Sequence, residues 1–102
     1  MSRAGNSAKS AGQNTAVGSG ALENNVTGFA NTAIGSDALN TVRQGDYNTG
    51  LGYSACANVT GSNKTCIGAS SGPASGSDWA SDDKERIFIG SRSKFNNGPA
   101  VL

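Results

Sequence analysis

Histidine is absent from this 102-residue chain, and long hydrophobic runs are absent as well. Without histidine, the commonest general base of enzymes and a common zinc ligand are missing. No carboxylate pair is evident from the spacing, and no serine has an evident base as partner, so we expect neither enzymatic activity nor a cofactor or metal site. No stretch approaches the roughly 20 apolar residues that a membrane-spanning helix needs, so membrane insertion is not expected.

Charge of either sign is sparse, since 8 basic and 7 acidic residues give a formal net charge of +1. The lysines and arginines are scattered and form no basic stripe of the kind that nucleic-acid-binding proteins present to phosphates. Nucleic acid is therefore not an expected partner. Residues 1–6 contain no apolar run and do not resemble a signal peptide. We expect a chain that is made without one, or a piece of a longer chain.

Cysteine is limited to Cys56 and Cys66. Two cysteines do not make the framework of a disulfide-rich domain, and a zinc site usually needs four ligands at short spacings. Free cysteines are often buried and behave as small apolar side chains. We predict that both are free thiols buried in the interior.

Large apolar side chains are also few, because hydrophobic residue types make up 35% of the chain while glycine alone contributes 15 residues. Ordering the backbone costs roughly 1–2 kcal/mol per residue, and a thin core would not offset that cost. Stacking of repeats, or association with other copies, would supply the missing burial.

What the chain does contain is a repeat. The pentads are Asn-Thr-Ala-Val-Gly at 14–18, Asn-Thr-Ala-Ile-Gly at 31–35, Asn-Thr-Gly-Leu-Gly at 48–52 and Lys-Thr-Cys-Ile-Gly at 64–68. They start at 14, 31, 48 and 64, so the intervals are 17, 17 and 16 residues. Arg-Ile-Phe-Ile-Gly at 86–90 is a degenerate fifth copy, after an insertion that breaks the period. A constant period predicts stacked units.

Each pentad predicts a short strand that ends at its glycine, because threonine, valine and isoleucine favour extended backbone. Side chains alternate between faces, so the second and fourth positions share one face. We assign the large apolar fourth position to the core or to contact with partner chains, in a ladder of Val17, Ile34, Leu51 and Ile67. The small third position, Ala16 and Ala33, indicates close approach of another layer or chain. The Ala-Leu pairs that end in Leu22 and Leu39 predict a second strand-like segment of the same ladder.

The period indicates an all-β fold. Seventeen extended residues span roughly 55 Å, which suits one flattened turn of a coil, and glycine recurs too often for a helix. We predict a repetitive parallel β-roll or β-helix of four to five rungs, with stacked asparagines at the first pentad position. Residues 1–11 are expected to form a flexible N-terminal arm and 12–72 the roll, while 73–102 hold the insertion loop, the last rung and a C-terminal tail.

The string Asn-Thr-Ala-Ile-Gly-x-x-Ala-Leu, followed by an Asn- and Gly-rich turn, resembles repeats of phage and large-virus tail fibres. It is also similar to the head repeats of trimeric autotransporter adhesins of the YadA type. The resemblance covers about residues 12–72, with a weaker match at 86–90. It implies a homotrimer within an extracellular fibre that contacts a host cell-surface receptor. The longer period, with no stalk or anchor, favours a virion tail fibre or spike over the bacterial cell surface.

The insertion holds the only tryptophan, Trp79, between Asp78 and Asp82. We favour the interpretation that Trp79 caps the open end of the stack or packs against a neighbouring chain. Alternatively, an exposed tryptophan beside aspartates can stack on a sugar ring, which makes these three residues candidates for binding a host glycan. The aspartate spacing does not match a calcium-binding EF-hand loop.

A second class of function stays open. A flat threonine ladder would let a monomer bind carbohydrate or an ice lattice, through Thr15, Thr32, Thr49 and Thr65. In our strand assignment these threonines share a face with the aliphatic ladder, which predicts that they point inward or toward a partner chain and favours the fibre. Phe29 and Tyr47 precede pentads at nearly the same phase and are expected to stack on one edge.

Overall fold

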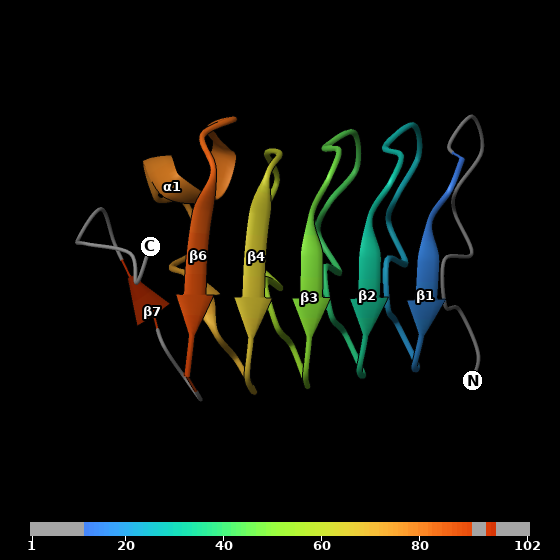
Figure 1. Cartoon of the computed structure of the whole chain (residues 1–102), viewed down its shortest axis with the longest axis horizontal. Helices are drawn as coiled ribbons and strands as arrows, with labels where there is room; N and C mark the ends of the chain where they lie inside the picture. The colour runs from blue at the N-terminus through green and yellow to red at the C-terminus, as the bar shows by residue number, and fades with distance from the viewer. Residues whose placement is uncertain (1–11, 91–93, 96–102) are drawn as a thin grey trace.

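The computed structural model describes residues 12–90 and the backbone of residues 94–95. The predicted arm at 1–11 and most of the predicted tail lie outside the described residues. Within them the chain is mostly strands, as predicted (Figure 1). One parallel sheet has the strand order β1 (Thr15–Val17), β2 (Thr32–Ile34), β3 (Thr49–Leu51), β4 (Lys64–Ile67) and β6 (Arg86–Ile89).

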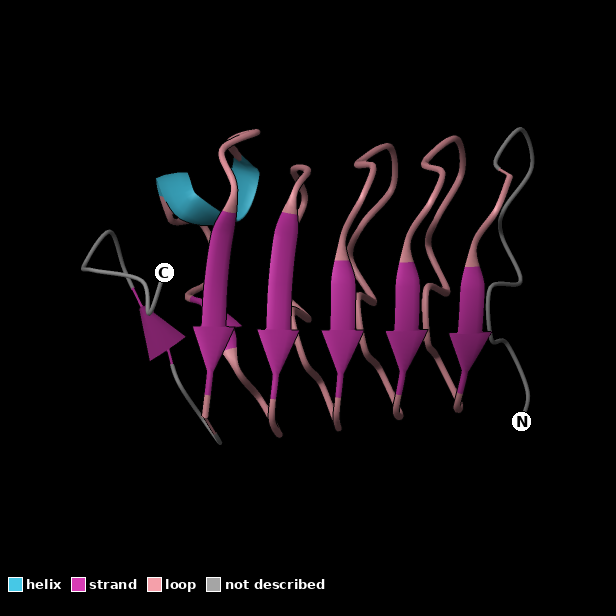
Figure 2. Cartoon of the chain, in the orientation of Figure 1, coloured by secondary structure: helices cyan, strands magenta, loops and turns pink. Residues whose placement is uncertain are grey.

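Three short elements lie outside this sheet, and two of them belong to the insertion. Strand β5 (Gly72–Pro73) pairs in parallel with β7 (Lys94–Phe95), and α1 (Asp78–Ser81) is a single helical turn (Figure 2). The helix begins at Ser77, whose side chain accepts a hydrogen bond from the backbone N–H of Ala80. A serine N-cap of this kind satisfies one of the unpaired donors of a helix start.

The sheet register follows the sequence repeat. Thr15 pairs with Thr32, Thr32 with Thr49, and Thr49 with Thr65, so each pentad lies beside the same positions of the next. The degenerate copy joins in the same register, with Ile87 opposite Thr65. The prediction that all five copies form strands is therefore confirmed, including the copy that follows the insertion.

The segments that connect the strands, which we call return segments (18–31, 35–48 and 52–63), also pair one repeat apart. The backbone N–H of Leu22 donates to the carbonyl of Ala38 at 3.0 Å, and that of Leu39 donates to Ala55 at 3.0 Å. The N–H of Cys56 continues the series to Ser71 at 2.9 Å. Equal repeat lengths thus keep both the strands and the return segments in step.

The interior lies between the sheet and the return segments, and it is thin. Its larger side chains come mainly from the return segments, while strands β1 to β4 contribute small residues from the third pentad position and β6 contributes Phe88. Within the described residues the buried apolar cluster comprises Ala21, Leu22, Ala33, Ala38, Leu39, Val42, Ala55, Cys56, Val59, Cys66 and Phe88, with Ala16 packed against it.

The aliphatic ladder points away from this interior, so its assignment to the core of the chain was wrong. Its exposed fractions are 48% for Val17, 40% for Ile34, 43% for Leu51 and 39% for Ile67. The space opposite the third pentad position explains the inversion. A Cβ added to Gly50 would lie 2.9 Å from the carbonyl oxygen of Ala55 and 3.1 Å from Cγ of Leu39. The return segments already fill the interior beside β1 to β4, so only small residues fit on the inner face of these strands, whereas β6 places Phe88 there.

The glycine that ends each pentad allows the next layer to approach. Gly35 has a φ of 128°, a conformation that side chains other than glycine rarely adopt. A Cβ at this position would lie 2.5 Å from the carbonyl oxygen of Gly52, the equivalent glycine one repeat later. The repeated glycine is therefore required both by the backbone angle and by the spacing of the layers.

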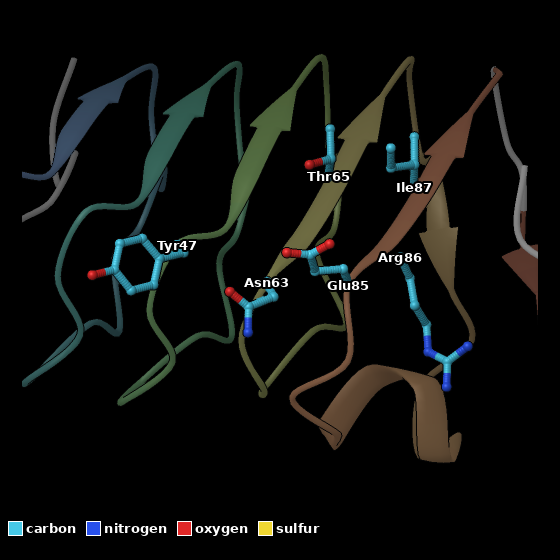
Figure 3. Close-up of a pocket in the computed structure, with 6 residues that line it drawn as sticks. All are labelled: Tyr47, Asn63, Thr65, Glu85, Arg86 and Ile87. Carbon is cyan, nitrogen blue, oxygen red and sulfur yellow. The ribbon is translucent and has the colours of Figure 1, made fainter. Parts of the chain in front are cut away.

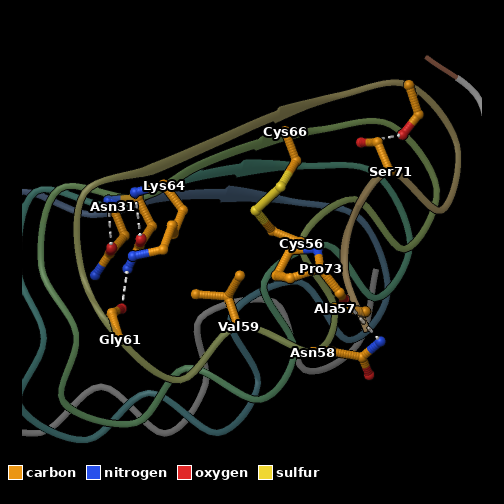
Figure 4. The surroundings of a disulfide bond; sticks show 12 residues. Asn31, Cys56, Ala57, Asn58, Val59, Gly61, Lys64, Cys66, Ser71 and Pro73 are labelled. Carbon is orange, nitrogen blue, oxygen red and sulfur yellow. Dashed lines mark hydrogen bonds between the residues drawn. A yellow bond between two sulfur atoms is a disulfide. The ribbon is translucent and has the colours of Figure 1, made fainter. Parts of the chain in front are cut away.

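Cys56 and Cys66 form a disulfide bond, so the prediction of free thiols was wrong, although both residues are fully buried as predicted (Figure 4). Cys56 occupies the return-segment position that Leu22 and Leu39 hold in earlier repeats, and Cys66 follows Gly50 on the inner face of the next strand. Since Leu39 and Gly50 face each other closely, a cysteine at each equivalent position brings the two sulfur atoms together. The disulfide replaces a leucine contact just before the insertion.

We expect the disulfide to stabilise the fold by about 2–3 kcal/mol, because it closes a short loop in the unfolded chain. Reduction with dithiothreitol should lower the urea midpoint of unfolding by the corresponding amount. The double variant Cys56→Ala, Cys66→Ala is the control, because the reductant should leave its midpoint unchanged. A midpoint for the unmodified chain that does not respond to complete reduction would contradict the expectation.

We also expect Leu39→Ala to lower the free energy of unfolding by about 2–5 kcal/mol, because it opens a cavity in a core with few large side chains. Val26→Ala is the matched control, since Val26 is a partly exposed residue of a turn. Chemical denaturation monitored by circular dichroism would measure both. A similar small loss in the two variants would argue against the described core.

Candidate functional site

The most extensive candidate surface is the outward side of the five-stranded sheet, which we call the outer face. Two files of side chains run along it, one for each outward position of the strands. The threonine file consists of Thr15, Thr32, Thr49, Thr65 and Ile87. The aliphatic file consists of Val17, Ile34, Leu51, Ile67 and Ile89.

The aliphatic file is exposed along its whole length, and Ile89 is 49% exposed at its end. Isolated apolar side chains on a surface need no explanation, but a continuous row of them commonly marks an interaction site. The in-register parallel pairing places these side chains in adjacent strands, so the row has no polar interruption from β1 to β6. The outer face can therefore bury apolar area against a flat partner.

The predicted asparagine ladder is confirmed, and it holds the start of each strand. The side-chain Oδ1 of Asn14 accepts from the backbone N–H of Asn31, and Oδ1 of Asn31 accepts from Asn48, both at 2.9 Å. Meanwhile the Nδ2 groups of Asn31 and Asn48 donate across the interior to the carbonyls of Gly45 and Gly61. Each amide thus joins one layer to the next and also joins the strand to its turn.

Lys64 stands at the ladder position where the fourth asparagine would be. Like the asparagines, it joins its strand to the neighbouring layer and to a turn, but through a charged ammonium group. Its backbone N–H donates to Oδ1 of Asn48 at 2.9 Å. The Nζ group is fully buried and donates to the carbonyls of Ser62 at 2.6 Å, Asp82 at 2.7 Å and Lys84 at 2.9 Å. The longer side chain thereby anchors the insertion to the sheet.

Asp82 is the counter-ion of this buried lysine. Its Oδ1 lies 2.9 Å from Nζ of Lys64, and its Oδ2 accepts from Nη2 of Arg86 at 2.8 Å. Burial raises the pKa of Asp82, but hydrogen bonds from Arg86 and Lys64 and the two positive charges outweigh it and lower the pKa to about 2. Burial lowers the pKa of Lys64, and the pair with Asp82 opposes that shift.

Trp79 covers the interior beyond β6. Its ring centroid lies 6.0 Å from that of Phe88 in the core, and the guanidinium of Arg86 stacks over the indole at 4.2 Å. A cation in this position is attracted by the aromatic face. Trp79 therefore packs within its own chain, in agreement with the capping interpretation. Asp82 is likewise engaged, whereas Asp78 is exposed at the start of α1. Glycan binding at these three residues stays a prediction that the geometry does not favour.

A separate hollow lies where the strands β3, β4 and β6 begin. It has a volume of about 320 Å³ and is lined by Tyr47, Asn63, Thr65, Glu85, Arg86 and Ile87 (Figure 3). The exposed Tyr47 ring stacks edge-on against Phe29, with centroids 5.3 Å apart, so the predicted aromatic edge is confirmed. The sequence did not identify the hollow because its lining comes from three different repeats.

Among the residues that the structure describes, no group of three potential metal ligands of the histidine, cysteine, aspartate or glutamate types lies together. No helix in this part of the chain has the length and apolar character required to span a membrane. Comparison with models of known protein families, with curated proteins and with solved structures finds no match for the chain.

The Asp82 cluster predicts a loss of stability in acid. Because the pKa of Asp82 falls from an ordinary 3.8 to about 2 on folding, its contribution is complete above the ordinary value. It is then lost as the pH falls toward the folded-state value. Urea unfolding followed between pH 5 and pH 2 should show this decline in the unmodified chain, and a smaller decline in Asp82→Asn.

At neutral pH, Asp82→Asn should cost roughly 1.5–3 kcal/mol, because the buried Lys64 loses its charged partner. The adjacent and exposed Asp83 provides a matched control, and Asp83→Asn should change stability by less than about 0.5 kcal/mol. Equal effects of the two substitutions would show that the Lys64–Asp82 pair does not anchor the insertion.

Proposed function

We propose that the chain is a β-roll module of a homotrimeric extracellular fibre, a virion tail fibre or spike, that helps attach to a host cell surface. In this proposal each repeat is one rung of the roll, and the outer faces of three copies pack against one another. The alternative location is the surface of a bacterium, as part of a trimeric adhesin.

The observation that carries the proposal is the exposed aliphatic file. A chain with a thin interior places its valine, isoleucine and leucine side chains outside, in a straight row along the whole sheet. Burying apolar surface stabilises association by roughly 25 cal/mol per Å², and an oligomer is the simplest arrangement that covers the same row on every copy. Parallel pairing of both strands and return segments supports the rolled arrangement of rungs.

The disulfide supports an extracellular location. Structural disulfides form and persist in oxidising environments and are rare in reducing cytosol. Cys56 and Cys66 are fully buried and joined in the core, which identifies this bond as structural. A fibre exposed outside a cell would gain from a cross-link at the junction between the regular repeats and the insertion.

A second candidate function rests on the threonine file. These threonines point outward together with the aliphatic file, whereas the sequence alone suggested that they turn inward or toward a partner. A flat, regular array of threonine and aliphatic side chains at the strand spacing of about 4.8 Å suits a repetitive ligand such as an ice lattice or a carbohydrate surface. A protein with this function would act as a monomer.

The mass in solution tests the proposed trimer. Sedimentation equilibrium of the full chain should give three times the 10.2 kDa chain mass. The double variant Ile34→Thr, Leu51→Thr should sediment as a monomer that keeps its β-type circular dichroism spectrum, because threonine suits a strand but removes apolar contact area. Val26→Thr, on a turn outside the outer face, is the control and should remain trimeric.

A monomer at all concentrations would contradict the trimer. If that monomer also produced thermal hysteresis in freezing measurements, the second candidate would replace the first. If it showed none, the trimer and the ice-binding form of the second candidate would both be wrong, and a pull-down with insoluble polysaccharide would test the carbohydrate-binding form.

A further inference from the structure

We propose that the hollow lined by Tyr47, Asn63, Thr65 and Glu85 is a binding subsite for a neutral hexose unit of a cell-surface polysaccharide. This inference deepens the attachment function proposed above and rests on it for the source of the sugar. The binding chemistry itself depends only on residues of one chain. The subsite also differs from the location suggested by the sequence, which was the Trp79 loop.

The hollow has the size and construction of a small-ligand site. Its volume of about 320 Å³ is at the lower end of the range of about 300–1,000 Å³ that is typical of such sites, which suits a single sugar ring. Tyr47 precedes β3, and Glu85 precedes β6. Asn63 is the residue before β4, and Thr65 lies within β4. Because the three strands are fixed in register, these side chains are held by the sheet itself.

Tyr47 supplies an apolar platform that the fold alone does not require. Its backbone φ is 61°, and the equivalent positions one repeat earlier and one repeat later, Ala30 and Asn63, have φ values of 59° and 64°. Asparagine tolerates this left-handed conformation, but a bulky residue there is a strained outlier. The tyrosine side chain is nevertheless 58% exposed. The left-handed angle belongs to the repeat, so what distinguishes Tyr47 is a bulky ring at this position with little burial in return, as is common at functional positions.

The Tyr47 ring is held in a defined orientation. Phe29 contacts it at an interplanar angle of 72°, while Phe29 itself does not line the hollow. Part of the Tyr47 ring therefore faces the hollow and is not covered by its aromatic neighbour. A pyranose ring has an apolar C–H face that can pack on such a surface. The tyrosine hydroxyl adds a hydrogen-bonding group at the solvent-exposed end of the ring.

The polar side of the hollow consists mainly of hydrogen-bond acceptors. Nδ2 of Asn63 donates to the carbonyl of Asp83 at 2.8 Å, and Figure 3 shows the amide oxygen directed to the side of Tyr47. The exposed Glu85 carboxylate extends over β4 near Thr65 in the same view. A carboxylate accepts two hydroxyl donors at once, and such charge-assisted hydrogen bonds are among the stronger ones. Adjacent hydroxyl groups of a hexose match this arrangement.

The charges favour a neutral sugar over an acidic one. Arg86 also lines the hollow, but its guanidinium is bound to Asp82 and stacked on Trp79. The remaining charge at the rim is the Glu85 carboxylate, which would repel a uronic or sialic acid. The hollow takes Thr65 and Ile87 from the threonine file and nothing from the aliphatic file. The subsite therefore borders the outer face, beside the aliphatic file that carries the proposed trimer contact, and it uses none of the side chains of that file.

Saturation-transfer difference NMR on the full chain tests the proposal. The probes are D-glucose, D-galactose, D-mannose and N-acetyl-D-glucosamine at millimolar concentration, with D-glucuronate as the acidic comparison. We expect saturation of the C–H protons of at least one neutral sugar and weaker transfer to glucuronate. Tyr47→Asn, which keeps the backbone conformation accessible, and Glu85→Gln should each weaken binding at least tenfold. Tyr53→Asn is the control, because Tyr53 is 60% exposed but lies outside the hollow.

Three results would overturn the subsite: no transfer to any neutral sugar, tighter binding of glucuronate, or an equal loss in the Tyr53→Asn control. Circular dichroism checks the fold of each variant, and Glu85→Gln decides the outcome if Tyr47→Asn does not fold. Sedimentation of the same samples separates this inference from the proposed function. A monomer that binds a neutral hexose would refute the trimer alone, and a trimer that binds none would refute the subsite alone.

Discussion

The narrow space between the sheet and the return segments is the constraint from which the other features follow. A Cβ on Gly50 would lie 2.9 Å from the carbonyl oxygen of Ala55 and 3.1 Å from Cγ of Leu39, which leaves little space opposite the return segment. Small residues therefore occupy the inner positions of β1 to β4, and the larger aliphatic side chains of these strands lie outside. An exposed apolar row is thus a structural consequence of a thin interior, and this row is the surface on which the proposed association rests.

The sequence predicted which segments form strands and how they pair, because a constant period determines register without any knowledge of the core. It also showed correctly that threonine and the aliphatic residue share a face. It did not show which face is inside, since alternation along a strand is the same in both cases. The deciding signal was volume: Leu22 and Leu39 in the return segments already supply the large core side chains, and this leaves room only for Ala33 or glycine opposite them.

The cysteines and the hollow were missed for a related reason. Cys56 and Cys66 occupy the positions of Leu39 and Gly50 one repeat later, so alignment of the repeats, with attention to which positions touch, would have indicated the bond. The hollow combines single residues from three repeats, and no local motif marks it. Its one sequence signal is Tyr47, an aromatic residue at the position where the next repeat has asparagine.

The shortened repeat shows how the architecture accommodates change. The interval from Asn48 to Lys64 is one residue less than the others, yet the amide of Asn48 still reaches the carbonyl of Gly61 and its Oδ1 still receives the next backbone N–H. The loss is absorbed between Val59 and Gly61, at the outer bend of the layer. Duplication or deletion of a whole layer would preserve the same asparagine hydrogen bonds to the layers on either side. Chains of this kind can therefore become longer or shorter by one layer at a time. Evolution can in this way change the length of the stack while the contacts between adjacent layers stay the same.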